Sequence, residues 1–209
     1  MSTRPTPRLL VKICGLTRVH DAEWCTELGA DYLGLNYSDS PRAAPLGLGR
    51  TLVEREFSVV GVFRGRSDEE IVDVVDRESL SVVQLHDPAS RRLQGALRTR
   101  RVEVWRALPA DEWASQDLSG ALRLVLDGPE PGSGKRANWG DFEPRHVPYP
   151  YLIAGGLNPD NVAAMVKQLR PTGVDVASGV ESAPGIKSPD KVRNFIDNAR
   201  RASGSEGSR

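Results

Sequence analysis

The sequence predicts an α/β fold, a single (β/α)8 TIM barrel with a parallel eight-stranded core. Eight short runs rich in β-branched residues alternate with amphipathic or charged stretches along the chain. The 209 residues suit one small closed barrel, whereas an open doubly wound sheet normally has fewer strands. Reactive or glycine-rich residues also collect where these runs end. A barrel enzyme carries its chemistry at the carboxyl ends of its strands, so this clustering supports the same fold.

The elements follow in regular order. We expect strands at 9–13, 31–37, 58–63, 81–85, 102–107, 121–126, 151–154 and 174–177. We expect helices at about 18–29, 47–55, 68–78, 88–98, 138–145, 158–169 and 189–200, with a short helix at 110–116. Ser67, Asn158 before Pro159 and Ser188 before Pro189 are typical residues for helix starts. The barrel therefore spans 9–200, between a flexible leader at 1–8 and a flexible tail at 201–209.

Composition excludes several classes of protein. The 28 basic and 28 acidic residues balance, whereas a general nucleic-acid binder needs a basic surplus to neutralise phosphates. No apolar run approaches the roughly 20 residues of a membrane span, and the first residues lack the apolar core of a secretory signal. The two cysteines, Cys14 and Cys25, cannot form a disulfide scaffold, so we expect a cytoplasmic protein.

Two glycine-containing loops predict a phosphate site. Gly155 and Gly156 follow the seventh strand, and Ser178 and Gly179 follow the eighth. Barrel enzymes often bind substrate phosphate on these two loops, because glycine lets backbone N–H groups approach the anion closely. Taken singly, the glycines could instead only form tight turns, but the pairing on neighbouring strands favours a phosphosugar ligand.

Cys14 and Asp127 end the first and sixth strands and are candidates for acid–base chemistry. By strand alternation Lys12 lies on the same side as Cys14 and could favour its thiolate. The alternative for Cys14 is a small buried apolar residue, and for Asp127 a turn former beside Gly128.

Other charged residues are expected inside the barrel or near its site. We expect Lys12, Arg106 and Asp175 to point into the barrel, together with Arg123, as paired charges beneath the site. Arg42, in a Ser-Pro-Arg loop, could bind a carboxylate through its planar fork.

No metal site is expected. His20, His146 and Cys25 have no metal-ligand spacing with other residues. The Gly132–Lys135 segment lacks the full spacing of a phosphate-binding P-loop and is interpreted as part of a lid at 128–137.

Seven motifs in order carry a family resemblance. They are KICGLT at 12–17, GADYLGL and SPR within 29–42, VGVF at 60–63, VQLH at 83–86, LD and GSGK within 126–135, IAGGLNPDNV at 153–162, and GVDVASGVE with PGIK at 173–187. Across about residues 10–197 the chain resembles phosphoribosylanthranilate isomerase, a (β/α)8 enzyme of tryptophan biosynthesis.

The resemblance implies an Amadori rearrangement of an aminoaldose to an aminoketose, without metal or cofactor. It implies Cys14 as general base, Asp127 as general acid and Arg42 as the ligand of the anthranilate carboxylate. His86 would line the ring pocket, and the 155–156 and 178–179 loops would hold the phosphate. Gln84, Lys12 and Asn36 complete the expected substrate-binding residues.

The second strand departs from the family pattern. The segment from Gly34 to Arg42 is one residue shorter than usual, lacks the usual proline and contains Asn36. Two alternatives therefore stay open: the same chemistry on a different amino-phosphosugar, or a non-catalytic phosphosugar-binding barrel. The sequence leaves monomer and homodimer equally open.

Overall fold

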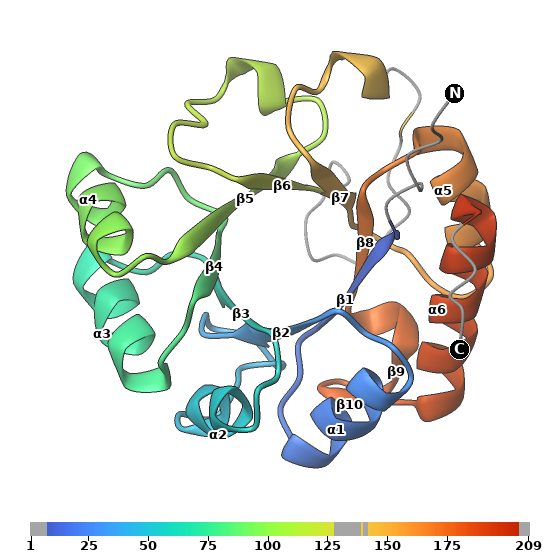
Figure 1. The fold of residues 1–209 in the computed structure, drawn as a ribbon, viewed down its shortest axis with the longest axis horizontal. Helices are drawn as coiled ribbons and strands as arrows, with labels where there is room; N and C mark the ends of the chain where they lie inside the picture. Colours follow the sequence, from blue (N-terminus) through green and yellow to red (C-terminus); the bar gives the residue numbers. More distant parts are fainter. Residues whose placement is uncertain (1–7, 128–138, 140–141, 205–209) are drawn as a thin grey trace, which may run out of the picture.

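A computed structural model describes residues 8–127, 139 and 142–204, and the strands within them close into a parallel barrel (Figure 1). The strands are β1 Leu10–Cys14, β2 Tyr32–Asn36, β3 Val59–Phe63, β4 Val82–Leu85, β5 Glu103–Pro109, β6 Arg123–Asp127, β7 Tyr151–Ile153 and β8 Gly173–Val176. Each pairs with its neighbour in sequence, and β8 closes the ring on β1. The predicted fold class is confirmed, and all eight expected strands form.

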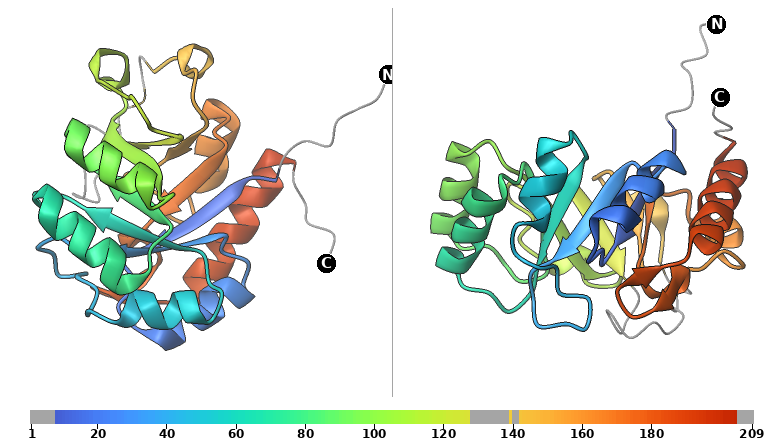
Figure 2. Two further views of the ribbon diagram at one scale, coloured as in Figure 1. Left: turned by 60° about the vertical axis from the view of Figure 1, so that its left-hand side comes forward. Right: turned by 90° about the horizontal axis from the view of Figure 1, so that it is seen from below.

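Helices surround the barrel (Figure 2). The helices are α1 Val19–Glu27, α2 Leu48–Glu54, α3 Asp68–Glu78, α4 Arg91–Thr99, α5 Val162–Leu169 and α6 Pro189–Ser203. Short 3-10 turns are η1 Trp113–Ser115, η2 Pro144–His146 and η3 Ser178–Val180, and β9 Glu181–Ala183 pairs with β10 Ile186–Lys187 in a small hairpin. None of the helices in the described ranges is long and apolar enough to cross a membrane.

The helix starts follow local chemistry. Ser67 and Glu70 form a reciprocal capping box at the start of α3, as the sequence indicates. Pro189 occupies the first turn of α6, although the Ser188 side chain makes no capping bond. Asn158 instead accepts the N–H groups of Asp160 and Asn161 in a turn, so α5 begins only at Val162. Helix α6 continues to Ser203, into the segment expected to be a tail.

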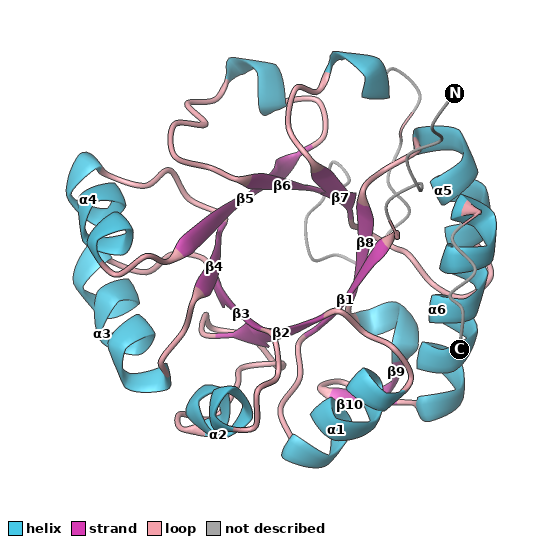
Figure 3. Ribbon diagram, viewed as in Figure 1, coloured by secondary structure: helices cyan, strands magenta, loops and turns pink. Residues whose placement is uncertain are grey.

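The helix predicted at 138–145 is wrong. Described residues of this stretch are not helical before the η2 turn, and η1 likewise replaces the short helix expected at 110–116 (Figure 3). Trp139 and Phe142 lie 5.2 Å apart between ring centroids, and Phe142 lies 5.9 Å from Tyr151. The aromatic residues thus pack on the barrel as an edge-to-face cluster, and their three-residue spacing imitates a helical period.

The barrel interior confirms most of the expected inward charges. Lys12 is fully buried and bonds Asp175 across β1 and β8, and the Arg123 guanidinium lies 5.2 Å from the Trp105 ring centroid. Arg106 is the exception: Trp105 and Ala107 take the inward positions on β5, so Arg106 points outward. There its guanidinium donates to the backbone carbonyls of Leu85 and Asp87.

Candidate active site

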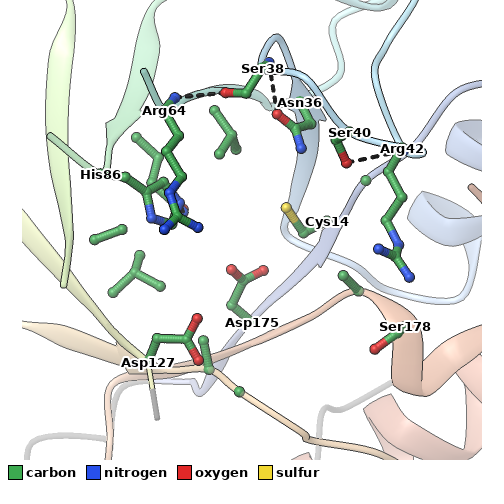
Figure 4. Close-up of a pocket in the computed structure, with 18 of the residues that line it drawn as sticks. Cys14, Asn36, Ser38, Ser40, Arg42, Arg64, His86, Asp127, Asp175 and Ser178 are labelled. Atoms are coloured by element: carbon green, nitrogen blue, oxygen red, sulfur yellow. Dashed lines mark hydrogen bonds between the residues drawn. The ribbon is translucent and has the colours of Figure 1, made fainter. Parts of the chain in front are cut away.

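A cavity of about 420 Å³ opens at the carboxyl ends of the strands (Figure 4). Its size is that of a small-metabolite site. Among the described residues, the polar and charged side chains that line it come from most of the strand ends: Cys14, Asn36, Ser38, Asp39, Ser40, Arg42, Arg64, Gln84, His86, Asp127, Asp175 and Ser178. Residues far apart in the sequence therefore converge on one space.

Cys14 ends β1 with its thiol on the inner side. Gly34, its partner on β2, makes room for it: a Cβ on Gly34 would lie 2.7 Å from Sγ. Burial raises the pKa of the Cys14 thiol, and Asp175 adds to this, while Lys12 and Lys187 oppose it. The sequence-based expectation that Lys12 favours the thiolate is thus correct in sign but is outweighed by burial.

Lys12 and Asp175 form a buried ion pair beneath the cavity. The Lys12 ammonium lies 2.9 Å from Oδ2 of Asp175. Burial by itself would lower the pKa of Lys12, but Asp175 reverses this and the pKa is raised, so the side chain stays charged. Oδ1 of Asp175 is buried, lies at the cavity and has no hydrogen-bond partner within the described residues. It can accept a donor from a ligand.

Asp127 ends β6 and faces the same cavity. Leu124 and Leu126 pack outward against the helices, so alternation turns Asp127 inward, as the sequence predicts. Figure 4 shows the Asp127 carboxylate and the Cys14 thiol at two sides of the cavity, with Asp175 between them. A carboxyl group and a thiol can therefore act on one ligand from different directions.

The loops after β7 and β8 are in close contact. A Cβ on Gly179 would lie only 1.9 Å from the carbonyl oxygen of Leu157, so glycine is required for this approach. Gly155 and Gly156 both have positive φ, at 87° and 64°. Their N–H groups make no hydrogen bond to any residue that the structure describes. Free N–H groups in consecutive positive-φ residues suit a phosphate.

Arg42 is held by a residue that the sequence analysis missed. Its Nε lies 2.9 Å and 3.0 Å from the two oxygens of Glu181, and its Nη2 lies 2.9 Å from Oε2. Burial would raise the pKa of Glu181, but Arg42 and Lys187 lower it overall, so the carboxylate is charged. One edge of the Arg42 guanidinium is thereby occupied, while Nη1 makes no hydrogen bond to the residues that the structure describes and can donate to a ligand. The 139-residue separation leaves no local sequence signal for this pair.

Gln84, His86 and Asn36 line the cavity as expected. Burial, followed by the charges of Lys12 and Arg64, lowers the pKa of His86 to about 4, so its ring is neutral near pH 7. Gln84 lies 3.2 Å from the His86 ring, and its Oε1 is buried without a partner among the described residues. The side-chain oxygen Oδ1 of Asn36 accepts the N–H of Ser38, which leaves the side-chain amide nitrogen turned into the cavity (Figure 4).

Two predicted site residues do not line the cavity. Lys12 is fully buried and paired with Asp175, and Gly179 packs against the backbone of Leu157. Arg64 lines the cavity but was not predicted, although its alternation with Val60 and Val62 could have revealed it. The predicted lid at 128–137 lies outside the described residues. Within the described ranges, no three His, Cys, Asp or Glu side chains are grouped as a metal site.

Known proteins match this arrangement. The family model for N-(5'phosphoribosyl)anthranilate (PRA) isomerase matches residues 11–198. An N-(5'-phosphoribosyl)anthranilate isomerase of Magnetococcus marinus is 38% identical, over 92% of this chain and 95% of the relative. The crystal structure of phosphoribosyl anthranilate isomerase from Thermotoga maritima superposes with a TM-score of 0.81 at 33% identity, covering 92% of this chain and 99% of the other.

A further solved structure carries a ligand. It is phosphoribosyl anthranilate isomerase in complex with reduced 1-(o-carboxyphenylamino)-1-deoxyribulose 5-phosphate. It has a TM-score of 0.79 and 31% identity, and the match covers 92% of this chain and 99% of the other.

Proposed function

The chain belongs to the N-(5'-phosphoribosyl)anthranilate isomerase family, and we propose that Cys14 and Asp127 perform its reaction as general base and general acid. The reaction is the Amadori rearrangement of N-(5-phosphoribosyl)anthranilate to 1-(2-carboxyphenylamino)-1-deoxyribulose 5-phosphate, in tryptophan biosynthesis. One observation carries the assignment: Cys14 and Asp127 end different strands and face a single cavity bounded by the glycine loops after β7 and β8.

The reaction needs one proton delivered and one removed. Asp127 donates its proton to the furanose ring oxygen while the bond from C1 to that oxygen breaks. The nitrogen lone pair forms the C1=N bond, which gives a cationic Schiff base. The Cys14 thiolate then removes the C2 proton, and the electrons of the C–H bond form C1=C2 and neutralise the nitrogen. The resulting enolamine tautomerises to the ketone. Each group contributes about 10²–10⁴-fold to the rate.

The raised pKa of Cys14 fits this order of events. Burial keeps the thiol protonated in the free protein, where an idle thiolate would be costly. Formation of the cationic Schiff base adds a positive charge beside Lys12 and Lys187, which already lower the thiol pKa. The thiolate is thus favoured at the step that uses it. Lys12 serves this electrostatic role, in place of the expected direct contact with substrate, while its partner Asp175 opposes it and keeps Lys12 charged.

The remaining contacts follow from unpaired groups. The N–H groups of Gly155 and Gly156, together with Ser178, receive the phosphate, and Gly179 holds their loop in place. Asp175 Oδ1 and Gln84 Oε1 accept hydrogen bonds from the sugar hydroxyl groups. Arg42 offers its free edge to the anthranilate carboxylate, and neutral His86 lies against the ring.

Replacement of each catalytic group tests the proposal. Purified Cys14→Ser and Asp127→Asn should each turn over N-(5-phosphoribosyl)anthranilate at least about a hundredfold more slowly than the unmodified protein. Both variants should keep the circular dichroism and melting temperature of a folded barrel. The unmodified chain should restore growth of a tryptophan auxotroph that lacks this step. Near-normal turnover by either folded variant would refute the role of that residue.

A second substrate is supported by Asn36. Its amide nitrogen faces the cavity from the shortened loop that also carries Arg42. The same acid–base chemistry could therefore act on another amino-phosphosugar whose substituent accepts a hydrogen bond there. The test measures turnover of a panel of ring-substituted N-(5-phosphoribosyl)anilines by the unmodified protein and by Asn36→Val. It distinguishes the anthranilate substrate from another amino-phosphosugar. A preference for a ligand other than the anthranilate, lost in Asn36→Val, would favour the second substrate.

The cellular setting remains part of the proposal. The free cysteines Cys14 and Cys25 favour a cytoplasmic enzyme. Its partner is a small phosphosugar rather than a nucleic acid or a membrane, and it acts as a monomer or a homodimer. Size-exclusion chromatography with light scattering distinguishes the two states.

A further inference from the structure

The cavity holds a cation that the acid–base mechanism does not use. In the described part of the chain, Arg42 and Arg64 are the cationic side chains that line it. Arg42 already forms a bidentate pair with Glu181. Arg64 is an exposed residue whose backbone N–H is hydrogen-bonded, whereas its guanidinium has no hydrogen bond or ion pair to the residues that the structure describes. An unpaired guanidinium at the wall of a cavity is available to an anionic ligand.

The local fold directs Arg64 toward the ligand. Val60 and Val62 of β3 face the barrel interior, so alternation points residue 64 inward as well. The backbone is fixed on both sides: Ser38 Oγ accepts the N–H of Arg64 at 2.6 Å, and Asp87 accepts the N–H of Gly65 at 2.6 Å. Figure 4 shows the Arg64 side chain pointing into the cavity with its guanidinium beside His86.

The strand order places Arg64 across the cavity from the phosphate loops, at the end where the aromatic ring of the substrate would lie. The phosphate loops follow β7 and β8, whereas β3 lies four strands from β7 in a closed ring of eight. A ligand with its phosphate on those loops must reach across the cavity to meet Arg64. Glu181 meanwhile occupies one edge of the Arg42 guanidinium, so Arg42 has a single edge left for a carboxylate. Arg64 and His86 lie on the side of the cavity away from the phosphate loops, and His86 is neutral near pH 7.

We propose that Arg64 binds the carboxylate of the substrate's aromatic ring, as a second guanidinium in addition to that of Arg42, and so selects carboxylated substrates. This inference rests on the proposed function, since that substrate carries one anion at each end. The planar fork of arginine matches a carboxylate with two parallel hydrogen bonds, which a lysine cannot provide. Arg64 is thus a specificity residue that takes no part in proton transfer.

The test compares two substrates that differ only in the carboxylate. They are N-(5-phosphoribosyl)anthranilate and N-(5-phosphoribosyl)aniline, each prepared from the amine and ribose 5-phosphate. In Arg64→Gln we expect kcat/KM to fall about 10- to 100-fold for the first substrate, the range of a lost hydrogen bond to a charged group. For the second it should stay within about twofold. For the anthranilate substrate, the kcat/KM of Arg64→Lys should lie between those of the unmodified protein and Arg64→Gln, because lysine keeps the charge and lacks the planar fork.

Arg77→Gln is the matched control. Arg77 lies on α3, exposed and paired with Asp73, outside the cavity, and its loss should leave both substrates unaffected. Equal losses on both substrates in Arg64→Gln, or no loss on either, would overturn the inference. A different result tests the underlying function: if the unmodified protein turns over neither substrate, the proposed isomerase activity itself fails. The two failures are therefore distinguishable.

Discussion

Replacement of Gly179 by alanine tests whether the close approach of two loops builds the phosphate site. The Cβ of an alanine would lie 1.9 Å from the Leu157 carbonyl oxygen, whereas contacts under 3.0 Å essentially never occur. The loops after β7 and β8 would have to separate by about 1 Å. A misplacement of this size at a binding site can cost about 10²-fold.

The assay is steady-state kinetics with N-(5-phosphoribosyl)anthranilate, together with competitive inhibition by inorganic phosphate. We expect KM and the phosphate inhibition constant to rise together by at least about tenfold, because the displaced groups bind the phosphate. Gly95→Ala on α4 is the matched control, since its Cβ would meet no atom within 4 Å. Unchanged KM and inhibition in a folded Gly179→Ala variant would refute the placement of the phosphate on these loops.

Three further predictions concern other contacts. Glu181→Gln should raise KM at least about fivefold with little change in kcat, and should lower the free energy of unfolding by about 3–5 kcal/mol, because it leaves Lys187 and Arg42 without their carboxylate. A folded variant with normal KM would show that Arg42 needs no such partner. The rate of Cys14 alkylation by iodoacetamide should keep rising above about pH 8.5, because burial raises the thiol pKa and only the thiolate reacts. A pH–rate profile with its midpoint below that pH would mean that Lys12 outweighs burial. Ser67→Ala should lower the free energy of unfolding by about 1 kcal/mol through loss of the α3 cap, with turnover unchanged; equal stability in urea unfolding would contradict this.

The sequence predicts the strands well because their patterns are local. β-branched runs bounded by turn residues give all eight strands, and inward alternation places Cys14 and Asp127 at the cavity. The failures also have local causes. The prediction that Arg106 points into the barrel is wrong, because Trp105 takes the inward position on β5 and only the packing of the folded barrel shows this.

Long-range pairing is what the sequence could not supply. Glu181 lies 139 residues from Arg42, and their ion pair depends on the loop after β2 meeting the hairpin after β8. The sequence also does not show whether burial or neighbouring charge decides the pKa of a side chain. Lys12 lies two residues from Cys14 as expected, but the direction of the thiol pKa follows from the depth of the cavity floor.

The segment from Ser178 to Lys187 joins both halves of the site. Its first residues approach the β7 loop at the phosphate end, and Glu181 then fixes Arg42. The hairpin is bonded in turn to the segment that follows Cys14: Thr17, in the loop after β1, donates to the Gly185 carbonyl, and Asp21, in α1, accepts the N–H of Lys187. A shift of this segment must therefore move the phosphate loop and Arg42 together. Substitutions along it should change substrate affinity as a unit, while Arg64, anchored separately to Ser38, acts independently of it.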